Sequence, residues 1–292
     1  MTLKSLGIIL TSCAALVAAA AAPAQNLSTV QTPRLYVLEG GVLESDPANY
    51  RLTADDVQAT QLSVAAYLIV HPRGVLLWDA GAIADSERIS ETGGVQQRVV
   101  RHDGNERFVT LGPSLVSQIT AVGYPPSSVT HLVLSHYHWD HTANANDFAH
   151  AAWLVRAAER ERMFATDPPG GTRPATYDKL RSVRPVIVSA DEHDVFGDGT
   201  VVIRQARGHT EGHSVLYVKL ARTGGVVLSG DLYHYPAERT LNRLPTFEVS
   251  EADTQAARDE LERFLTRTGA RLWIQHDLVA HRKLKKAPEY YD

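Results

Sequence analysis

Short runs of apolar residues recur along the chain and predict a succession of β-strands. Residues 34–38 are expected to form the first strand, and residues 65–70 and 75–78 a hairpin that turns at residues 71–74. Further strands are predicted at residues 131–135, 153–155, 186–188, 201–203, 214–220, 226–228 and 272–274.

Two stretches carry apolar residues at helical spacing. One contains Leu115, Ile119 and Val122, and the other covers residues 251–268 and ends before Gly269. Because strands outnumber helices and several strands are adjacent in pairs, we expect a layered α/β fold with mixed sheets.

Three stretches between these elements are predicted to be loops or small insertions: residues 81–112, 166–184 and 235–250. Long irregular segments in a compact domain often serve as lids or binding loops. No internal repeat or linker separates the elements, so residues 25–292 are expected to form a single domain.

The first 24 residues predict a secretory signal peptide. Lys4 precedes an apolar run over residues 6–22, and residues 22–24 offer an Ala-x-Ala site with cleavage before Gln25. The run is short for a membrane span, which needs about 20 apolar residues. A lipoprotein box ending at Cys13 is the less favoured alternative. We therefore expect a periplasmic or secreted enzyme with no membrane contact after signal cleavage.

Composition narrows the class of protein. The chain has 292 residues, of which 44% are hydrophobic and 21% charged, as in ordinary globular proteins. A net charge of −4 argues against a nucleic-acid-binding protein, because such proteins usually carry an excess of basic residues. One cysteine excludes a disulfide framework, whereas thirteen histidines call for an explanation. The expected partner is a small-molecule substrate, and a homodimer is left open.

The histidines concentrate where a buried strand ends. The apolar run 131–135 leads directly into His136, His138, Asp140 and His141. In extended backbone, residues two apart point the same way, so His136 and His138 could grip one ion together. A polar surface turn rich in histidine is the alternative, but the preceding apolar residues favour a metal site.

Three further elements place a metal-binding residue type just after an apolar run. They contribute His209, Asp231 and His276. Residues delivered from several strand ends to one edge of a sheet form a preorganised cleft. Five histidines and two aspartates suffice for two divalent metal ions. Imidazole and carboxylate ligands without thiolate favour Zn²⁺, with iron, cobalt or manganese as alternatives.

At these residues the sequence resembles the metallo-β-lactamase superfamily, whose fold is an αββα sandwich of two mixed sheets flanked by helices. The resemblance covers essentially the whole mature chain. It implies two metal sites, the first with ligands His136, His138 and His209, the second with ligands Asp140, His141 and His276, and with Asp231 bridging both. It also implies that Asp79 orients a ligand histidine.

The remaining histidines are interpreted as solvated or structural: His71, His102, His131, His150, His193 and His281. His213, four residues after His209, is expected to support the turn rather than bind metal.

Two metal ions can share a bridging hydroxide at neutral pH, because metal binding lowers the pKa of water to about 7. We expect that hydroxide to attack a carbonyl while Asp140 transfers its proton to the leaving group. The reaction class is hydrolysis of an ester, lactone, thioester, amide or phosphoester.

More detailed sequence resemblance favours a lactone as the substrate. Residues 68–74, 78–81 and 135–144 look most like N-acyl-homoserine-lactone lactonases, and a bridging Asp231 argues against a true β-lactamase. Those lactonases carry a catalytic tyrosine three residues after the bridging aspartate. Here that position is His234, next to Tyr233, and both are candidate catalytic residues.

An acylated lactone also needs an apolar groove. The candidates are Met163, Phe164, Tyr177, Leu241, Leu244 and Phe247, with core or lid packing as the alternative for each. Rival functions are a β-lactamase-like or general ester or thioester hydrolase, an iron-dependent sulfur dioxygenase-like oxidoreductase, and a non-catalytic metal-binding protein.

Overall fold

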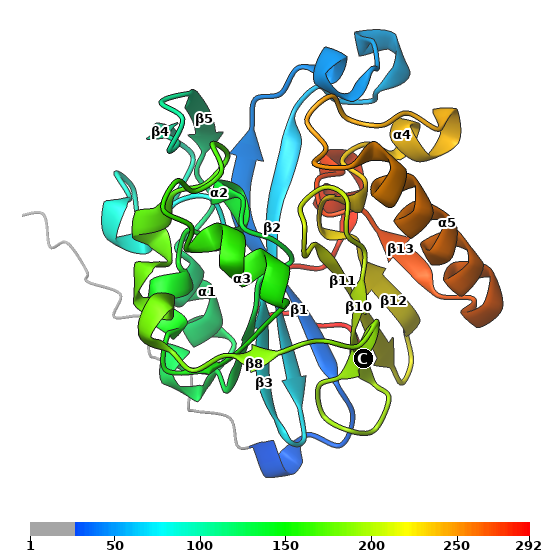
Figure 1. The fold of residues 1–292 in the computed structure, drawn as a ribbon. Helices are drawn as coiled ribbons and strands as arrows, with labels where there is room; N and C mark the ends of the chain where they lie inside the picture. The colour runs from blue at the N-terminus through cyan, green and yellow to red at the C-terminus, as the bar shows by residue number, and fades with distance from the viewer. Residues whose placement is uncertain (1–26) are drawn as a thin grey trace, which may run out of the picture.

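Two β-sheets face each other and carry helices on their outer sides in the computed structural model, which describes residues 27–292 (Figure 1). This architecture confirms the predicted mixed α/β sandwich. The predicted signal peptide and Cys13 lie outside the described residues. Within residues 27–292, no helix combines the length and the apolar character that a membrane crossing requires.

The first sheet has eight strands in the order β4-β5-β1-β2-β3-β6-β7-β8. Their bounds are β1 Arg34–Leu43, β2 Leu62–His71, β3 Gly74–Trp78, β4 Gln96–Val100, β5 Glu106–Thr110, β6 His131–Val133, β7 Ala152–Val155 and β8 Val186–Ile187. Strands from β4 to β3 pair antiparallel, and those from β3 to β8 pair parallel.

The second sheet has five strands in the order β13-β12-β11-β10-β9. Their bounds are β9 Glu192–Asp194, β10 Val201–Gln205, β11 Ser214–Leu220, β12 Gly224–Leu228 and β13 Arg271–Trp273. Only the last pair, β12 with β13, is parallel.

Six α-helices and nine 3₁₀ segments connect the strands of the described chain. The helices are α1 Leu115–Ala121, α2 Trp139–Thr142, α3 Ala157–Met163, α4 Pro236–Leu241, α5 Glu251–Thr268 and α6 Leu278–Lys283. The 3₁₀ segments are η1 Leu27–Thr29, η2 Pro47–Tyr50, η3 Ala54–Asp56, η4 Asp85–Glu87, η5 Pro126–Ser128, η6 Ala145–Phe148, η7 Pro174–Thr176, η8 Asp178–Ser182 and η9 Gly230–Leu232.

The core between the sheets follows from strand alternation. Strand β2 is buried along its whole length. Its Tyr67 and Ile69 face the second sheet, where they join Leu216 and Leu228. Its Leu68 faces the other way and packs in the cluster beneath α1. A strand buried on both faces reads as a continuous apolar run, which is why this region was readily predicted.

The stretches predicted as loops contain more regular structure than expected. Residues 81–112, interpreted as a loop or a small insertion, include the β4–β5 hairpin, which the sequence pattern did not predict. The hairpin lies at the edge of the first sheet and buries only Val99 and Val109, which leaves its other strand positions exposed or half-buried. Residues 235–250 likewise include α4. Helices α3 and α6 and strand β9 were not predicted at all.

Helix α5 anchors the segment that follows β12 through one buried arginine. Arg258 is 2% exposed and its guanidinium lies 3.0 Å from Glu238 Oε1, in α4. It also donates a hydrogen bond to the carbonyl oxygen of Leu232. Glu238 in turn accepts hydrogen bonds from the backbone N–H groups of His234 and Tyr235. The pair therefore fixes the path of residues 231–238.

We expect Arg258→Met to lower the free energy of unfolding by about 3–5 kcal/mol, because it leaves the Glu238 carboxylate buried without its cation. Chemical denaturation followed by circular dichroism measures the change. Arg263→Met is the matched control on the same helix. Its exposed pair with Glu260 should contribute less than about 0.5 kcal/mol. Equal denaturation midpoints for both variants would contradict the prediction.

Candidate metal centre

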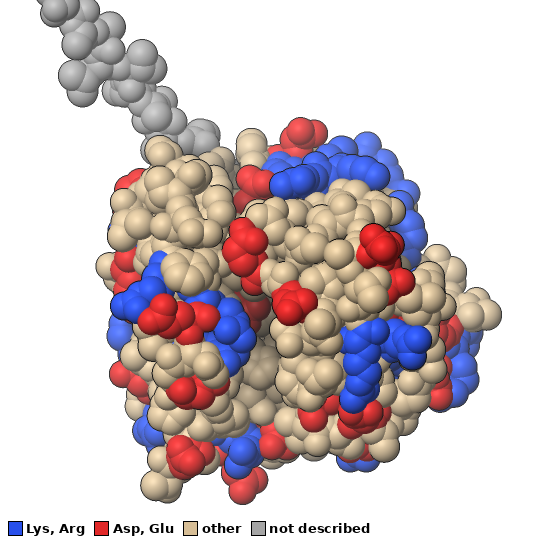
Figure 2. Space-filling model, turned by 90° about the horizontal axis from the view of Figure 1, so that it is seen from above, with Lys and Arg blue, Asp and Glu red and all other residues tan. Residues whose placement is uncertain are grey.

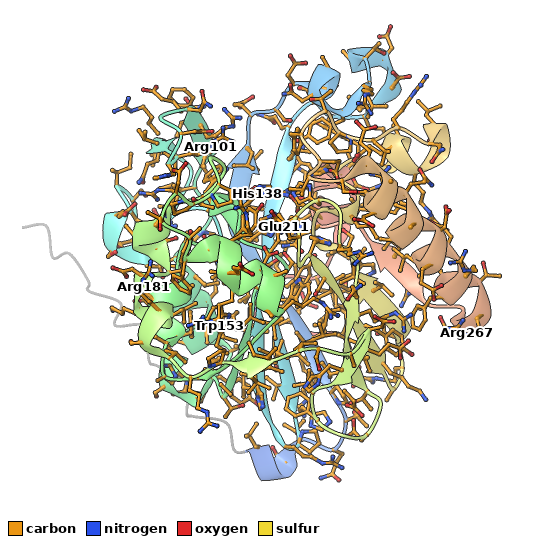
Figure 3. All side chains as sticks on the ribbon, in the orientation of Figure 1. Arg101, His138, Trp153, Arg181, Glu211 and Arg267 are labelled. Atoms are coloured by element: carbon orange, nitrogen blue, oxygen red, sulfur yellow. The ribbon has the colours of Figure 1, made fainter. Side chains whose placement is uncertain are left out.

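Four loops at one edge of the sandwich bring the predicted metal-binding residues together. They follow β6, β10, β12 and β13, of which the first three end in largely buried residues and β13 is exposed to half-buried. Figure 3 shows His138 near the upper end of the sheets, between the green and the yellow halves of the chain. Residues 140 positions apart in sequence therefore meet at one place, as the motif spacing predicted.

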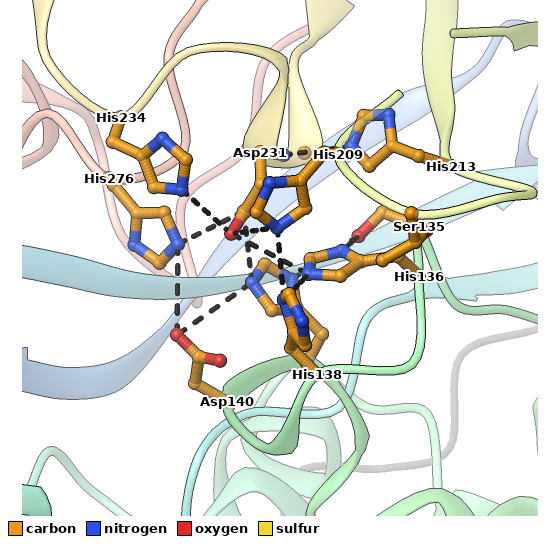
Figure 4. Close-up of polar contacts among 12 residues, drawn as sticks. Ser135, His136, His138, Asp140, His209, His213, Asp231, His234 and His276 are labelled. Atoms are coloured by element: carbon orange, nitrogen blue, oxygen red, sulfur yellow. Dashed lines mark hydrogen bonds and ion pairs between the residues drawn. The ribbon is translucent and has the colours of Figure 1, made fainter. Parts of the chain in front are cut away.

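The first cluster contains three imidazoles. His138 Nδ1 lies 2.9 Å from His136 Nε2 and 2.9 Å from His209 Nε2. Asp231 Oδ2 lies 3.5 Å from His136 Nε2 and 3.4 Å from His209 Nε2 (Figure 4). These four ligand atoms all lie within 4.8 Å of one another.

The second cluster surrounds the other carboxylate oxygen of Asp231. Asp231 Oδ1 is 3.0 Å from His141 Nε2 and 3.0 Å from His276 Nε2. Asp140 Oδ2 completes the group at 3.8 Å from each of those two nitrogens. Asp231 therefore presents one oxygen to each cluster, which is the geometry that a bridging ligand requires.

The hydrogen bonds behind the histidines show that these clusters suit cations. The outer nitrogens of His141, His209 and His276 face oxygen acceptors: Asp79 at 2.9 Å, Glu248 at 3.0 Å and the Ser63 carbonyl at 2.7 Å. A neutral imidazole has one N–H, which those acceptors draw outward. In the neutral tautomer that a metal ligand adopts, the inner nitrogens then carry lone pairs that converge.

Converging lone pairs need a positive charge between them. His138 Nδ1 carries at most one proton and cannot satisfy both His136 and His209. Although His141 Nε2 and Asp231 Oδ1 lie 3.0 Å apart, both atoms are buried and neither makes a hydrogen bond within the described residues. A buried polar atom without a partner is costly, and a metal ion would supply one for each. The residues present therefore fit a metal centre.

Asp79 organises the histidines from behind. It is fully buried at the end of β3, and its Oδ1 accepts a hydrogen bond of 2.6 Å from the Ser135 N–H. Its Oδ2 accepts bonds from Gln275 Nε2 at 2.7 Å and from the Ser135 hydroxyl at 3.0 Å. Asp79 has a φ of +59°, a strained conformation that aspartate tolerates better than most residues.

His213 supports the site without joining either cluster. Its Nδ1 donates to the carbonyl oxygen of Ala206 at 2.9 Å, and its Nε2 accepts from the Asp231 N–H at 2.9 Å. Burial lowers the pKa of His213 to about 3, which keeps the ring neutral as this pattern requires. A Cβ at Gly230 would lie 2.6 Å from His213 Nε2, so only glycine fits there.

The two candidate catalytic residues after Asp231 point in opposite directions. His234 is 2% exposed, and its Nε2 lies 3.1 Å from Asp231 Oδ2. The Tyr233 hydroxyl instead donates to Glu262, 3.4 Å away on α5. Because Tyr233 has extended backbone, successive side chains face opposite sides. The structure therefore brings His234 to the centre and does not bring Tyr233 there.

Charge around His234 favours its protonated form. Burial lowers the pKa of this imidazole, but the carboxylates of Asp231 and Glu238 raise it to about 10. The ring is stacked parallel to that of His276, with centroids 5.4 Å apart.

A cavity of about 780 Å³ opens above both clusters, and it includes His138, Asp140, Asp231, His234 and His276 in its lining. Figure 2 shows this face of the molecule, which is hollowed between two halves and has acidic and basic side chains on both sides. The walls include apolar, aromatic and cationic residues: Tyr50, Leu62, Arg101, Arg107, Phe108, Trp139, Phe247 and Val249.

Of the residues predicted to line an apolar groove, only Phe247 lies in this cavity. Met163 and Tyr177 are buried in the core on the outer face of the first sheet, and Phe164 packs against them there. Leu241 is exposed, and neither it nor Leu244 lines the cavity. The packing alternative therefore holds for Met163, Phe164 and Tyr177.

Sequence reasoning missed the carboxylates that support the site. Glu248 lies in a stretch interpreted as a loop, and Glu159 and Glu238 lie in helices that were not predicted. Each is a single acidic residue with no motif around it, and only the folded chain brings it against the site. Phe108, on the missed β4–β5 hairpin, escaped notice for the same reason.

Comparison with known proteins agrees with this geometry. A family model for the Metallo-beta-lactamase superfamily matches residues 59–276. N-acyl homoserine lactonase AttM from Azorhizobium caulinodans is 30% identical over 269 residues, covering 89% of this chain and 98% of the relative. AttM from Rhizobium johnstonii is 31% identical over 265 residues, covering 88% and 98%.

Solved structures show the same fold. A mutant of B. thuringiensis AiiA with N-decanoyl-L-homoserine bound at the active site matches with a TM-score of 0.72 at 19% identity, covering 89% of this chain and 99% of that one. AidC, a dizinc quorum-quenching lactonase in complex with a product, matches with a TM-score of 0.62 at 16% identity, covering 89% and 94%.

The family model spans most of the chain, and the AttM relatives align with it almost end to end. The chain belongs to the metallo-beta-lactamase superfamily, and within it resembles the N-acyl homoserine lactonase branch.

Proposed function

We propose that this protein is a metal-dependent hydrolase that opens the lactone ring of N-acyl homoserine lactones. One observation carries the proposal: the Asp231 carboxylate lies between two histidine clusters on the floor of a cavity of about 780 Å³. The names of the AttM relatives supply the substrate class. A carboxylate that presents one oxygen to each of two clusters suits hydrolysis by two metal ions, in which no protein nucleophile is needed.

The ligand assignment follows the two clusters. In the proposal, His136, His138 and His209 would hold the first metal and Asp140, His141 and His276 the second, with Asp231 available to both. The donors favour Zn²⁺, although iron, cobalt and manganese accept the same set. When bound, such ions lower the pKa of water to about 7 and polarise a carbonyl oxygen.

The side chains around the metals handle protons and position the substrate. Asp140 lines the cavity, so its carboxylate is placed to accept a proton from the attacking water and return it to the leaving oxygen of the lactone. His234 is the candidate catalytic side chain of the cavity, because it lies beside Asp231 and carries positive charge there, whereas the Tyr233 hydroxyl contacts α5. Phe108, Phe247 and Val249 are exposed apolar residues of the cavity wall and would cover the acyl chain.

The cellular location stays part of the proposal. A signal peptide over residues 1–24 would deliver the enzyme to the periplasm or the medium, where it would meet a diffusible lactone. The mature chain would then contain no cysteine.

We expect Asp231→Asn and His209→Ala each to reduce lactone hydrolysis more than about 100-fold, because even residues that only orient metal ligands contribute 10–100-fold. A pH-stat assay measures the one proton released per ring opened. His150→Ala, at an exposed position outside the cavity, is the control and should retain activity. A fully metallated enzyme that ignores lactones and rapidly hydrolyses a cephalosporin would refute the substrate class.

Metal analysis of the purified protein should find about two zinc ions per chain. Removal by a chelator should abolish activity and lower the melting temperature, since the lone pairs of the buried histidines then face one another without a cation. Added Zn²⁺ should restore both. Iron accompanied by oxygen uptake on a thiol substrate would instead favour a sulfur dioxygenase-like oxidoreductase.

Substitution of His234 by glutamine should lower kcat about 100-fold with metal content unchanged, because the positive charge beside Asp231, which would stabilise negative charge developing on the substrate, is lost. Tyr233→Phe is the paired variant and should turn over at the wild-type rate, since its hydroxyl contacts Glu262 on α5. Steady-state kinetics with parallel metal analysis tests both. A slow Tyr233→Phe enzyme beside an unaffected His234 variant would reverse the assignment.

A further inference from the structure

Glu159 is a buried carboxylate that contacts two of the loops carrying the histidine clusters. It lies on α3 and is 2% exposed. Its Oε1 accepts a hydrogen bond of 2.6 Å from the backbone N–H of Tyr137. Its Oε2 accepts bonds of 2.8 Å from the Thr210 hydroxyl and 2.8 Å from the Gly212 N–H.

The positions of these partners are what give Glu159 its significance. Tyr137 lies between His136 and His138, and Thr210 directly follows His209. The three imidazoles of the first cluster therefore come from two loops that are both hydrogen-bonded to one side chain. A shift of either loop relative to Glu159 would change the distance between His209 and the other two rings.

Only a carboxylate satisfies this arrangement. The backbone N–H groups of Tyr137 and Gly212 can only donate, and they face different oxygens of Glu159. A glutamine has one acceptor oxygen and one NH₂ group, so one of the two N–H groups would face another donor. The approach is also close, because a Cβ at Gly212 would lie 2.7 Å from Glu159 Cβ.

A second, more exposed contact joins the same loops. The Tyr137 hydroxyl donates to Glu211 Oε2 at 3.0 Å, and Arg162 of α3 pairs with Glu211 at 2.9 Å. Because these side chains are partly solvated, the contact contributes less than the buried hydrogen bonds of Glu159.

We propose that Glu159 is a positioning residue that sets the spacing between the His136–His138 loop and the His209 loop, and thereby the affinity of the first metal site. The proposal rests on the metal centre assigned above. Glu159 does not line the cavity and contacts none of the seven ligands, so it acts through Tyr137, Thr210 and Gly212.

The test compares Glu159→Gln with Glu161→Gln, an isosteric change at an exposed position of the same helix. Burial raises the pKa of Glu159 to about 7, so measurements at about pH 8.5 keep the wild-type carboxylate ionised. Competition with a chromophoric chelator gives the zinc affinity. We expect Glu159→Gln to weaken one of the two zinc-binding steps about 10–100-fold. Glu161→Gln should bind zinc as tightly as the wild type.

Substitution with Co²⁺ distinguishes positioning of the ligands from a general effect on stability. The visible spectrum of the Co²⁺-substituted protein reports ligand geometry, and we expect its bands to change in Glu159→Gln but not in Glu161→Gln. Unfolding of the metal-free proteins is measured alongside. An affinity loss together with a metal-free melting temperature close to wild type supports positioning.

Thr210→Val keeps the test decisive if Glu159→Gln does not fold. It removes one of the three hydrogen bonds without changing side-chain volume, so we expect a smaller loss of zinc affinity in the same binding step. Combined with Glu159→Gln, it should add less than its effect alone, since both variants disturb one contact.

Unchanged zinc affinity and an unchanged cobalt spectrum in both Glu159→Gln and Thr210→Val would overturn the inference while leaving the lactonase proposal intact. Wild-type protein that binds no zinc would instead refute the metal centre itself. The two failures are therefore distinguishable in one set of titrations.

Discussion

The buried carboxylate of Asp231 is the feature on which the rest of the site depends. Its two oxygens face two groups of imidazole nitrogens, and it remains there because its own backbone is held from several sides. His213 accepts the Asp231 N–H, Gly230 allows the ring of His213 to approach, and the Arg258–Glu238 pair fixes the segment that follows. A buried anion is stable only beside positive charge, so this arrangement connects folding with metal binding.

The outer nitrogens of three ligand histidines are also held in place by other parts of the chain. Asp79, Glu248 and the Ser63 carbonyl come from three different parts of the chain, and each holds the outer proton of one histidine. Orientation of the ligands is thus distributed over the whole sandwich rather than confined to the histidine-rich motif. The ligands themselves come from both sheets, since His136 to His141 follow β6 of the first sheet and His209, Asp231 and His276 follow β10, β12 and β13 of the second.

What the sequence could predict depends on how local the signal was. His136 to His141 form a compact motif, and His209, Asp231 and His276 each follow an apolar strand, so their convergence could be inferred. The β4–β5 hairpin was missed because an edge hairpin with two buried valines lacks an apolar pattern. For Met163 and Tyr177 both groove lining and core packing stayed open, because hydrophobicity alone does not distinguish core from cavity. The direction of Tyr233 and the partners of Glu159 are tertiary facts that no neighbouring residue signals.

The β4–β5 hairpin gives the two surfaces of the cavity different tolerances to mutation. Its Arg101, Arg107 and Phe108 belong to the cavity wall, yet the hairpin lies at a sheet edge and contributes little to the core. The floor, by contrast, consists of buried groups that all depend on one another. In the proposed lactonase, substitutions in the hairpin would therefore change the wall that covers the acyl chain while the buried floor stays unchanged, so that one catalytic floor could serve lactones with different acyl chains.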